Sequence, residues 1–306
     1  MKFISIQCNF GSKEILIDSL CNRIDPGTLK RIQEKSGITC LKICDETEDA
    51  ISLAQVLLES DVQKNIINSS DLIIVVSESK RSSIPPMSSR VLQKFDLSNT
   101  KLVLDLDSGC AGYVQALQVV DAFFQNPSYK NACIITTDAY SKYIDYADRT
   151  VAPIFGDGAS ITFLANDGNK SIKTFNNGSD MTKSGCLEIK GALGGNLKMS
   201  GGDIFMFVKK NVPNSVQDCL VKANLDKDEV DYFFIHQASR VVLEEIRKDL
   251  DISEAKAPFG VAETGNLVST SIPFLLQHIE DKLEHKKIIF TGFGVGLTWA
   301  TALMEL

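Results

Sequence analysis

A cysteine, Cys110, lies at a point where the pattern of apolar residues changes. The apolar run over 102–106 predicts a buried strand, and apolar positions three or four residues apart over 114–124 predict a helix. The thiol is therefore expected at a helix start, where unpaired N–H groups and the positive end of the helix dipole favour the nucleophilic thiolate. Because most single cysteines are small apolar core residues, this position alone does not establish a nucleophile.

Two further residues occupy the same kind of position. His236 ends the apolar stretch over 232–235, just before a predicted helix, and Asn266 lies in a glycine-containing turn before another. Taken singly, a buried structural histidine and a helix-capping asparagine are the commoner explanations. His278 and His285 lie among charged residues and are expected at the surface. The combination of Cys, His and Asn at such junctions indicates covalent catalysis on a thioester.

This set of side chains matches what carbon–carbon bond formation between thioesters requires. A thiolate accepts the acyl group. The N–H groups of a histidine and an asparagine can stabilise the enolate oxygen formed when a malonyl thioester loses CO₂, without a metal. The glycine-rich loop over 292–296 can bring main-chain N–H groups near the sulfur. It is not a dinucleotide-binding loop, because a strand-like stretch follows it rather than a helix.

Composition restricts the classes of protein that fit. The chain has 306 residues and a net charge of −7, which argues against general nucleic-acid binding. Its eight cysteines include no C-x-x-C pair, and no second Cys or His pair completes a metal site around Cys40 and Cys44. We expect free thiols, no metal and no disulfide framework.

Two apolar segments could be mistaken for membrane or export signals. The first ten residues are interrupted by Gln7 and Asn9, and their apolar run is too short for a signal peptide. The uncharged stretch over 288–304 is too short for a bilayer, and its glycines predict two buried strands joined by a turn. The sequence predicts a cytoplasmic protein that does not enter the membrane.

The order of predicted elements indicates an α/β protein in two halves. Strands alternate with helices, which predicts mixed, mostly parallel sheets, and a polar, glycine-containing interval begins near Asn166. We expect an N-terminal half over 1–166 that carries the cysteine, and a C-terminal half over 167–306 that carries His236 and Asn266. A helical stretch over 201–224 is expected to break near Pro213. If the strand ends of the two halves meet, Cys110 and His236 face one another across a cleft.

Five motifs in one order resemble a known family. They are DLDSGCAGYVQAL (105–117), DRTVAPIFGDGAS (148–160), HQASRVV (236–242), GNLVSTSIPFLL (265–276) and GFGVGLTWA (292–300). With these separations, nearly the whole chain is similar to β-ketoacyl-acyl carrier protein synthase III, a condensing enzyme of thiolase fold.

The resemblance implies a fold, an activity and a set of site residues. It implies a homodimer of five-layered αβαβα subunits that condenses an acyl thioester with malonyl-acyl carrier protein and needs no cofactor. Cys110 is then the acyl-accepting nucleophile, and His236 and Asn266 bind the malonyl thioester oxygen. The implied oxyanion hole consists of the N–H groups of Cys110 and Val295. The residues expected to contact substrate or coenzyme A are Arg31, Arg149, Gly294 and Gly296.

The chain departs from the family pattern at several substrate-facing positions. Arg31 stands where the family has a tryptophan, Ser239 replaces the last residue of HQAN, and Val295 replaces the middle glycine of the oxyanion turn. The acyl-pocket aromatic near Pro85 is missing. These changes indicate a specialised member, and they leave open whether coenzyme A or acyl carrier protein delivers the acyl group.

An acidic carrier protein needs a basic surface on an acidic enzyme. Arg240 and Arg247 are about two helical turns apart and are expected on one face, joined by Lys209 and Lys210. An ordinary solvated helix face explains the same spacing equally well.

Other functions share part of this pattern. Transfer of the acyl group from Cys110 to a hydroxyl or an amine uses the same cysteine and histidine, and only Asn266 favours condensation. A papain-like protease also has the order Cys, His, Asn, but its cysteine lies near the start of the enzyme rather than after 109 residues. A non-catalytic scaffold would not require the three residues to be intact.

Overall fold

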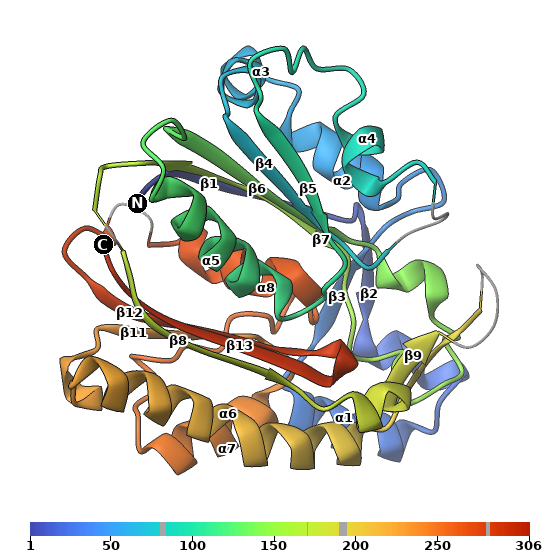
Figure 1. The fold of residues 1–306 in the computed structure, drawn as a ribbon. Helices are drawn as coiled ribbons and strands as arrows, with labels where there is room; N and C mark the ends of the chain where they lie inside the picture. The colour runs from blue at the N-terminus through green and yellow to red at the C-terminus, as the bar shows by residue number, and fades with distance from the viewer. Residues whose placement is uncertain (80–83, 170, 190–194, 280–281) are drawn as a thin grey trace.

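Two mixed β-sheets, each from one part of the chain, carry the elements that end at Cys110 and His236 (Figure 1). The structure is a computed structural model that describes residues 1–79, 84–169, 171–189, 195–279 and 282–306. In spatial order, the first sheet consists of β1 (Lys2–Phe10), β7 (Gly158–Ala165), β6 (Asn131–Asp138), β4 (Leu72–Val76) and β5 (Leu102–Leu106). The second consists of β11 (Tyr232–Ile235), β12 (Lys287–Gly294), β13 (Thr298–Glu305) and β8 (Ile172–Ser179).

Helices lie above, between and below the two sheets (Figure 1). The helices above the first sheet are α2 (Ala50–Leu57), α3 (Asp61–Asn68) and α4 (Met87–Val91). Those between the sheets are α5 (Gly112–Phe124) and α8 (Ser271–Gln277), and those below the second are α6 (Gly201–Ala223), α7 (Arg240–Leu250) and α1 (Pro26–Ser36). Short strand pairs complete the fold: β2 (Lys13–Leu16) with β3 (Cys40–Ile43), and β9 (Leu187–Ile189) with β10 (Leu197–Met199). None of the described helices has both the length and the apolar character needed to span a bilayer.

Short 3₁₀ helices connect several of these elements. They are η1 (Ile17–Asn22), η2 (Tyr140–Tyr143), η3 (Met181–Cys186), η4 (Lys227–Glu229), η5 (Val268–Thr270) and η7 (Val295–Leu297). Of these, η2, η5 and η7 lie in the loops next to the predicted site.

The prediction of mixed sheets is confirmed, but the expectation that most strand pairs are parallel is wrong. In the first sheet β4 pairs in parallel with β5 and β6, whereas β7 pairs antiparallel with β6 and β1. In the second sheet only β11 and β12 are parallel. Alternation of strands and helices predicts crossovers, but it does not show that the chain also returns through a glycine turn, as it does from β12 to β13.

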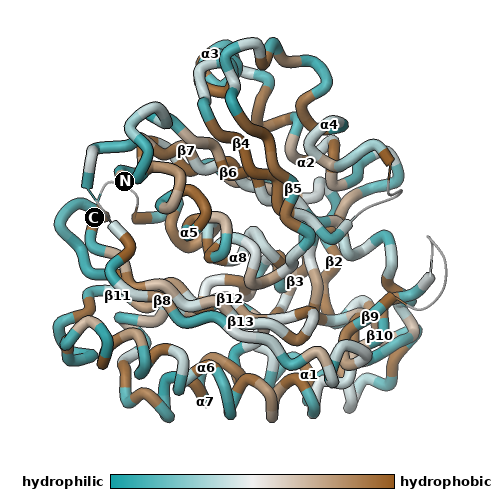
Figure 2. The backbone as a smooth tube through the Cα atoms, in the orientation of Figure 1, coloured by the Kyte–Doolittle hydropathy of each residue, from teal (hydrophilic) through white to brown (hydrophobic). Residues whose placement is uncertain are grey.

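The apolar core is continuous from one sheet to the other. Every residue of β4 is buried, because its side chains pack on one face against α5 and on the other against α2. Figure 2 shows the most hydrophobic backbone in β4, β6 and α5, with polar segments outside. One cluster of buried residues includes members of β4, α5, α8 and β12. The division into 1–166 and 167–306 stays a prediction: each side of it supplies one sheet, yet one core joins both.

The helix α6 runs unbroken past Pro213, so the predicted break is wrong. A proline inside a helix costs about 3 kcal/mol or more, because it removes one hydrogen bond and crowds the preceding turn. Val208, Val212 and Val216 are buried on both sides of Pro213 in the cluster that α6 shares with α7 and the second sheet. This packing holds both parts of the helix in line.

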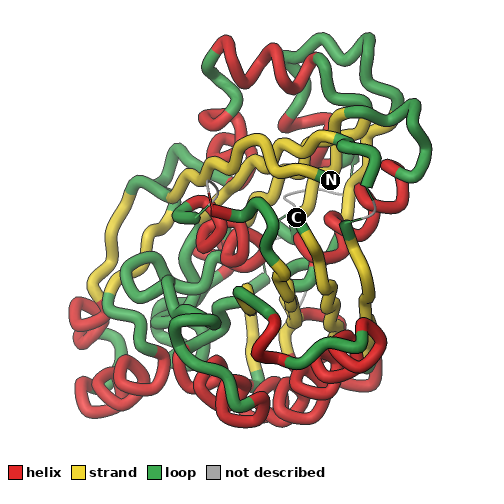
Figure 3. Tube along the Cα trace, turned by 90° about the vertical axis from the view of Figure 1, so that its left-hand side faces the viewer, coloured by secondary structure: helices red, strands yellow, loops and turns green. Residues whose placement is uncertain are grey.

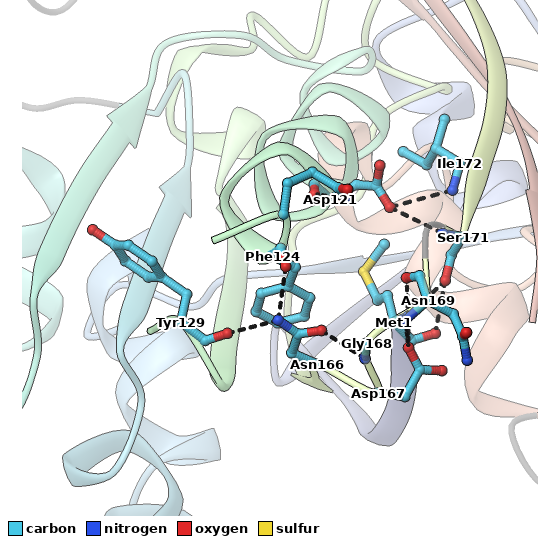
Figure 4. Close-up of polar contacts among 11 residues, drawn as sticks. Met1, Asp121, Phe124, Tyr129, Asn166, Asp167, Gly168, Asn169, Ser171 and Ile172 are labelled. Carbon is cyan, nitrogen blue, oxygen red and sulfur yellow. Dashed lines mark hydrogen bonds and ion pairs between the residues drawn. The ribbon is translucent and has the colours of Figure 1, made fainter. Parts of the chain in front are cut away.

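The segment that passes from the first sheet to the second is held by polar contacts (Figure 4). The Met1 ammonium group donates to Asp167 Oδ1 and to Ser171 Oγ, each at 2.6 Å. Asp121 on α5 accepts the Ser171 N–H at 3.2 Å, and Asn166 donates to two main-chain carbonyls at 2.8 Å. The two marked ends of the chain lie near one another in both views (Figures 1 and 3).

Candidate active site

Cys110 lies between the end of β5 and the start of α5 and is 4% exposed. Strand β12 of the second sheet also lies against Cys110. A Cβ atom built on Gly294 would lie 3.1 Å from the Cys110 sulfur, and one on Gly292 would lie 2.5 Å from the Cys110 carbonyl oxygen. The thiol therefore lies at the contact between the two halves, and these glycines allow β12 to approach it closely.

His236 follows β11 and is held by the same strand β12. The main-chain N–H of His236 donates to the Thr291 carbonyl at 2.8 Å. The His236 ring makes an edge contact with Phe293, with 5.3 Å between the ring centroids. Its Nδ1 lies 2.7 Å from Ser271 Oγ, which also accepts the Gln237 N–H at 3.4 Å. The Ser271 proton is then available to Nδ1, which favours the tautomer with its hydrogen on Nε2. Burial lowers the pKa of His236 to about 3, so the ring is neutral.

Asn266 is 4% exposed and is tied to the first half of the chain. The main-chain N–H of Asn266 donates to the Ile154 carbonyl at 2.8 Å, and its main-chain carbonyl accepts the Gly156 N–H at 3.0 Å. Its side-chain oxygen accepts the Val268 N–H at 2.9 Å, which leaves the side-chain NH₂ as the donor group. The Asn266 loop also packs beside the cysteine: a Cβ atom on Gly109 would lie 3.5 Å from a Val268 methyl group.

The structure thus brings the three predicted residues to one region. Strand β12 contacts both Cys110 and His236, while the Asn266 loop contacts Gly109, the residue before the cysteine. Asp138, at the end of β6, fixes this loop by accepting the Ser269 hydroxyl at 2.5 Å. The sequence reasoning missed Ser271 and Asp138. The sequence signal for Ser271 was its place within the motif that contains Asn266, and the signal for Asp138 was its place at the end of an apolar strand.

The predicted oxyanion-hole residues are Cys110 itself and Val295, which packs against the buried cluster that contains Cys110. Val295 follows Gly294 directly, and its carbonyl is held by the Thr298 hydroxyl at 2.9 Å. Gly296 has a φ of +125°, and a Cβ atom there would lie 2.6 Å from the Thr298 methyl group. Only glycine fits this turn without strain. Among the described residues, the Cys110 and Val295 N–H groups donate to no carbonyl in the turns and loops.

The expectation that the helix start favours a Cys110 thiolate is wrong for the protein without substrate. Burial raises the pKa of the Cys110 thiol well above its ordinary value, and the carboxylates of Glu78 and Asp138 raise it further. Removal of a thiolate from water and nearby negative charge both disfavour the ionised form, and here they outweigh the helix dipole. The resting nucleophile is therefore a thiol, and its proton must leave during acylation.

Glu78, two residues after β4, is a further carboxylate that the sequence reasoning missed. Its Oε2 accepts the Tyr140 hydroxyl at 2.8 Å, and a Cβ atom on Gly109 would lie 2.3 Å from the same oxygen. Burial raises the pKa of Glu78 to about 7, and the negative charge of Asp138 adds to this effect. The sequence did contain a signal for Glu78, because a charged residue that follows a fully apolar parallel strand lies where functional sites form in α/β folds.

Glu78→Gln is expected to remove a pH dependence of stability. The pKa of Glu78 is raised from 4.5 to about 7 on folding. Its stabilising effect is thus fully present below pH 4.5 and is lost as the pH rises through 7. The shift corresponds to about 3 kcal/mol. Between pH 5 and pH 8 the native chain should therefore lose about 2.5 kcal/mol of stability that Glu78→Gln does not lose, so the stability of the variant relative to the native chain should increase by that amount. Urea denaturation measures this, and Glu59→Gln, at an exposed carboxylate outside the site, is the control. An equal difference at both pH values would contradict the expectation.

The predicted coenzyme A residues Arg31 and Arg149 line one cavity of about 430 Å³. Arg31 lies on α1, which begins after the capping residue Asp25 and ends at Gly37, and Arg149 lies in the loop before β7. The lining also includes Ile154, whose carbonyl binds Asn266, and Ser239 at the start of α7. Two exposed guanidinium groups at a cavity connected to the Asn266 loop suit a phosphate-bearing carrier.

The four residues predicted to dock a carrier protein do not form one exposed face. Arg247 is 9% exposed, its Nε donates to the Ala257 carbonyl at 2.7 Å, and it lies 3.5 Å from Glu254. The interpretation of Arg247 as a docking residue is therefore corrected, because helical spacing does not show which neighbours cover a face. Lys209 is exposed and paired with Glu245, and Lys210 is exposed. Arg240 lies against Gly37, with its guanidinium 5.1 Å from the Phe259 ring centroid.

Comparison with family models identifies two matching regions. The model of 3-oxoacyl-[acyl-carrier-protein] synthase III matches residues 104–181, which include Cys110. The model of the C-terminal part of the same enzyme matches residues 220–306, which include His236 and Asn266. The two matches together cover more than half of the chain.

Similar proteins are found among curated sequences and solved structures. The β-ketoacyl-[acyl-carrier-protein] synthase III of Lactococcus lactis subsp. cremoris (strain MG1363) is 32% identical over 281 residues, 86% of this chain and 85% of the relative. That of Lactobacillus helveticus (strain DPC 4571) is 32% identical over 299 residues, 90% of this chain and 89% of the relative. The 3-oxoacyl-(acyl-carrier protein) synthase from Burkholderia xenovorans LB400 superposes with a TM-score of 0.90 at 27% identity, covering 100% of this chain and 93% of that one.

The fold and these matches define an acyltransferase of thiolase fold, with mixed sheets in two halves. The chain belongs to the 3-oxoacyl-[acyl-carrier-protein] synthase III family, so the resemblance noted in the motifs is confirmed.

Proposed function

We propose that this protein catalyses a decarboxylative Claisen condensation between an acyl group held on Cys110 and a malonyl thioester on acyl carrier protein. One observation carries the proposal: β12 contacts both the Cys110 sulfur and a neutral His236, the Asn266 loop contacts the residue before the cysteine, and neither His236 Nε2–H nor the Asn266 side-chain NH₂ donates to another of the described residues. In the first step, the sulfur bonds to the carbonyl carbon of an acyl thioester and the carrier thiol leaves with a proton. The N–H groups of Cys110 and Val295 bind the oxyanion of the tetrahedral intermediate.

In the second step, the malonyl thioester loses CO₂ and its carbonyl oxygen becomes an enolate. His236 Nε2–H and the Asn266 side-chain N–H donate to that oxygen, and a neutral histidine can do so without first losing a proton. The enolate carbon then bonds to the acyl carbon on Cys110, the C–S bond breaks and the sulfur recovers a proton. Burial of both donors strengthens their effect on the developing charge.

The cavity lined by Arg31 and Arg149 is proposed to hold the phosphate groups of coenzyme A or of a carrier-bound pantetheine. Arg149→Ala is expected to raise KM for an acyl-coenzyme A about tenfold with little change in kcat, since a hydrogen bond to a charged group contributes about 1.5 kcal/mol. Steady-state kinetics with Lys30→Ala, at an exposed α1 residue outside the cavity lining, is the matched control. An unchanged KM for Arg149→Ala would show that coenzyme A binds elsewhere.

Two interaction partners follow from the same family. Acyl carrier protein is proposed to dock near Arg240, Lys209 and Lys210, and KM for a carrier-bound substrate should then rise with salt.

A homodimer is proposed through β5, the last strand of the first sheet, whose five residues are all only half-buried. Pairing with a second copy would cover this open edge. Light scattering of the native protein tests the dimer, and a monomer would refute it.

Intact-protein mass spectrometry after incubation with a panel of acyl thioesters tests the first half of the reaction. A mass increment that is absent in Cys110→Ala identifies both the nucleophile and the acyl group, whereas an increment that persists would exclude Cys110. Release of labelled CO₂ from malonyl-acyl carrier protein tests the second half. Consumption of the acyl-enzyme by a hydroxyl or amine acceptor without CO₂ release would instead establish acyl transfer.

A further inference from the structure

Glu78 is a carboxylate beside the nucleophile that the mechanism above does not use. It follows β4, and Cys110 follows the neighbouring parallel strand β5, with Val76 paired to Leu106. The carboxylate extends to the chain just before the cysteine, because its Oε2 would lie 2.3 Å from a Cβ atom on Gly109. A side chain longer than hydrogen at position 109 would displace it. The packing therefore brings a proton-accepting group next to the buried thiol.

The surroundings of Glu78 hold its carboxylate in place and raise its affinity for a proton. Tyr140, which belongs to the same buried cluster as Cys110, donates its hydroxyl to Oε2 at 2.8 Å. Asp138 at the end of β6 and Asp107 after β5 both act on Glu78 with negative charge. The Asn266 loop contributes Val268, which is uncharged. A carboxylate in these surroundings takes up a proton at neutral pH more readily than an exposed one.

The other candidate for this task is His236. Its ring is buried and holds a proton weakly, and its Nδ1 is engaged with Ser271 Oγ. A ring of this kind suits donation to an enolate better than removal of a proton from a thiol. Asp138 is engaged by the hydroxyls of Ser269 and Ser79 and by the Glu78 N–H. Glu78 accepts the Tyr140 hydroxyl and the Gly109 N–H, fewer donors than Asp138 among the described residues, and it keeps the capacity to accept a proton.

We propose that Glu78 accepts the Cys110 thiol proton during acylation and that Tyr140 holds the carboxylate in position for this transfer. The proposal rests on the proposed function, because it assigns a group to the acylation of Cys110. As the sulfur forms its bond to the thioester carbonyl carbon, the S–H proton passes to Glu78. When the C–S bond to the carrier breaks, the same proton passes to the leaving thiolate, so Glu78 ends the step ionised and no other reactant is needed.

A purely electrostatic role for Glu78 predicts the opposite effect of mutation. Glu78 raises the pKa of the Cys110 thiol by its negative charge. If that were its only effect, Glu78→Gln would lower the pKa of the thiol and make acylation at neutral pH faster. If Glu78 accepts the proton, the same change removes the acceptor and makes acylation slower. The sign of the rate change therefore separates the two roles.

The test is the single-turnover rate of Cys110 acylation as a function of pH, measured by intact mass with the acyl thioester that loads the native protein. In the native protein the rate should rise with a midpoint near pH 7, the pKa of Glu78. Glu78→Gln should be acylated about 100-fold more slowly at pH 7, with a rise only at strongly alkaline pH as the thiol itself ionises. Glu59→Gln, at an exposed carboxylate outside the site, should stay within about threefold of the native rate.

Tyr140→Phe gives a second signature that does not depend on Glu78→Gln folding. The Tyr140 hydrogen bond lowers the pKa of Glu78, so its loss should move the midpoint of the rate profile to higher pH, and loss of the positioning contact should also lower the rate reached at high pH. Alkylation of Cys110 by iodoacetamide at pH 9.5 shows in each variant that the thiol can be reached. A rate for Glu78→Gln at pH 7 equal to or above the native rate, or an unmoved midpoint in Tyr140→Phe, overturns the proposal. A native protein that no thioester acylates overturns the proposed function as well.

Discussion

Replacement of Cys110 by alanine is expected to abolish formation of the acyl-enzyme and of the condensation product, while decarboxylation of the malonyl thioester persists. The sulfur is the only atom of Cys110 that can carry the acyl group, so no acceptor for the enolate remains. His236 and Asn266 are held by Ser271, Thr291, Ile154 and Gly156, and none of these contacts involves the cysteine side chain. The enolate can therefore still form and is then protonated by water.

Two assays measure this result separately. Product formation should fall by more than about 10⁴-fold, as expected when a covalent nucleophile is removed. Labelled CO₂ should still be released at a rate within about tenfold of the native protein. Cys133→Ala, at a buried cysteine of β6, is a matched control that should leave both assays nearly unchanged. Simultaneous loss of both activities in Cys110→Ala would indicate that Cys110 also supports the fold of the site.

Replacement of His236 or Asn266 by alanine is expected to have the complementary effect. Each change removes one donor to the enolate oxygen, and loss of one such donor reduces a rate by about 10²–10³-fold. Decarboxylation and condensation should both fall by that factor. Acylation of Cys110 should be largely kept, because neither side chain is placed in the oxyanion hole or in the proposed proton transfer from the thiol.

Intact mass spectrometry and CO₂ release distinguish the two half-reactions in these variants. His278→Ala is the matched control for His236→Ala, since His278 caps the end of α8 and its ring contacts Phe274 rather than the site. The double variant of His236 and Asn266 should fall by less than the product of the single effects, because the two donors act on one oxygen. If His236→Ala prevents acylation instead, His236 rather than Glu78 removes the thiol proton.

Several features of the site follow from local sequence. The apolar run before Cys110 and the helical spacing after it place the thiol at a strand end, and the structure confirms both β5 and α5 there. The same kind of pattern places His236 after β11. The turn that holds Asn266 is marked by Gly265, which has a φ of +78°. These features depend on residues close together in the chain, and short-range periodicity and turn chemistry are sufficient to determine them.

Other features depend on contacts between distant residues. Periodicity does not specify which strands pair, and so the prediction of mostly parallel sheets is wrong. Helical spacing placed Arg247 on an outer face, but the segment that contains Ala257 covers it. Pro213 remains inside α6 because packing on both sides of it outweighs one lost hydrogen bond.

The sequence by itself determined the identity of the three candidate catalytic residues and the position of each at the end of a strand or in a turn. Only the tertiary structure decided their chemical state. The Cys110 thiol holds its proton because it is buried and because Glu78 and Asp138 lie near it, and His236 is neutral because it is buried. Side-chain charge depends on the dielectric surroundings and on neighbours that are distant in the chain. Glu78 and Asp138 come near Cys110 when β4 pairs with β5 and with β6, and His236 is enclosed when β11 packs against α8.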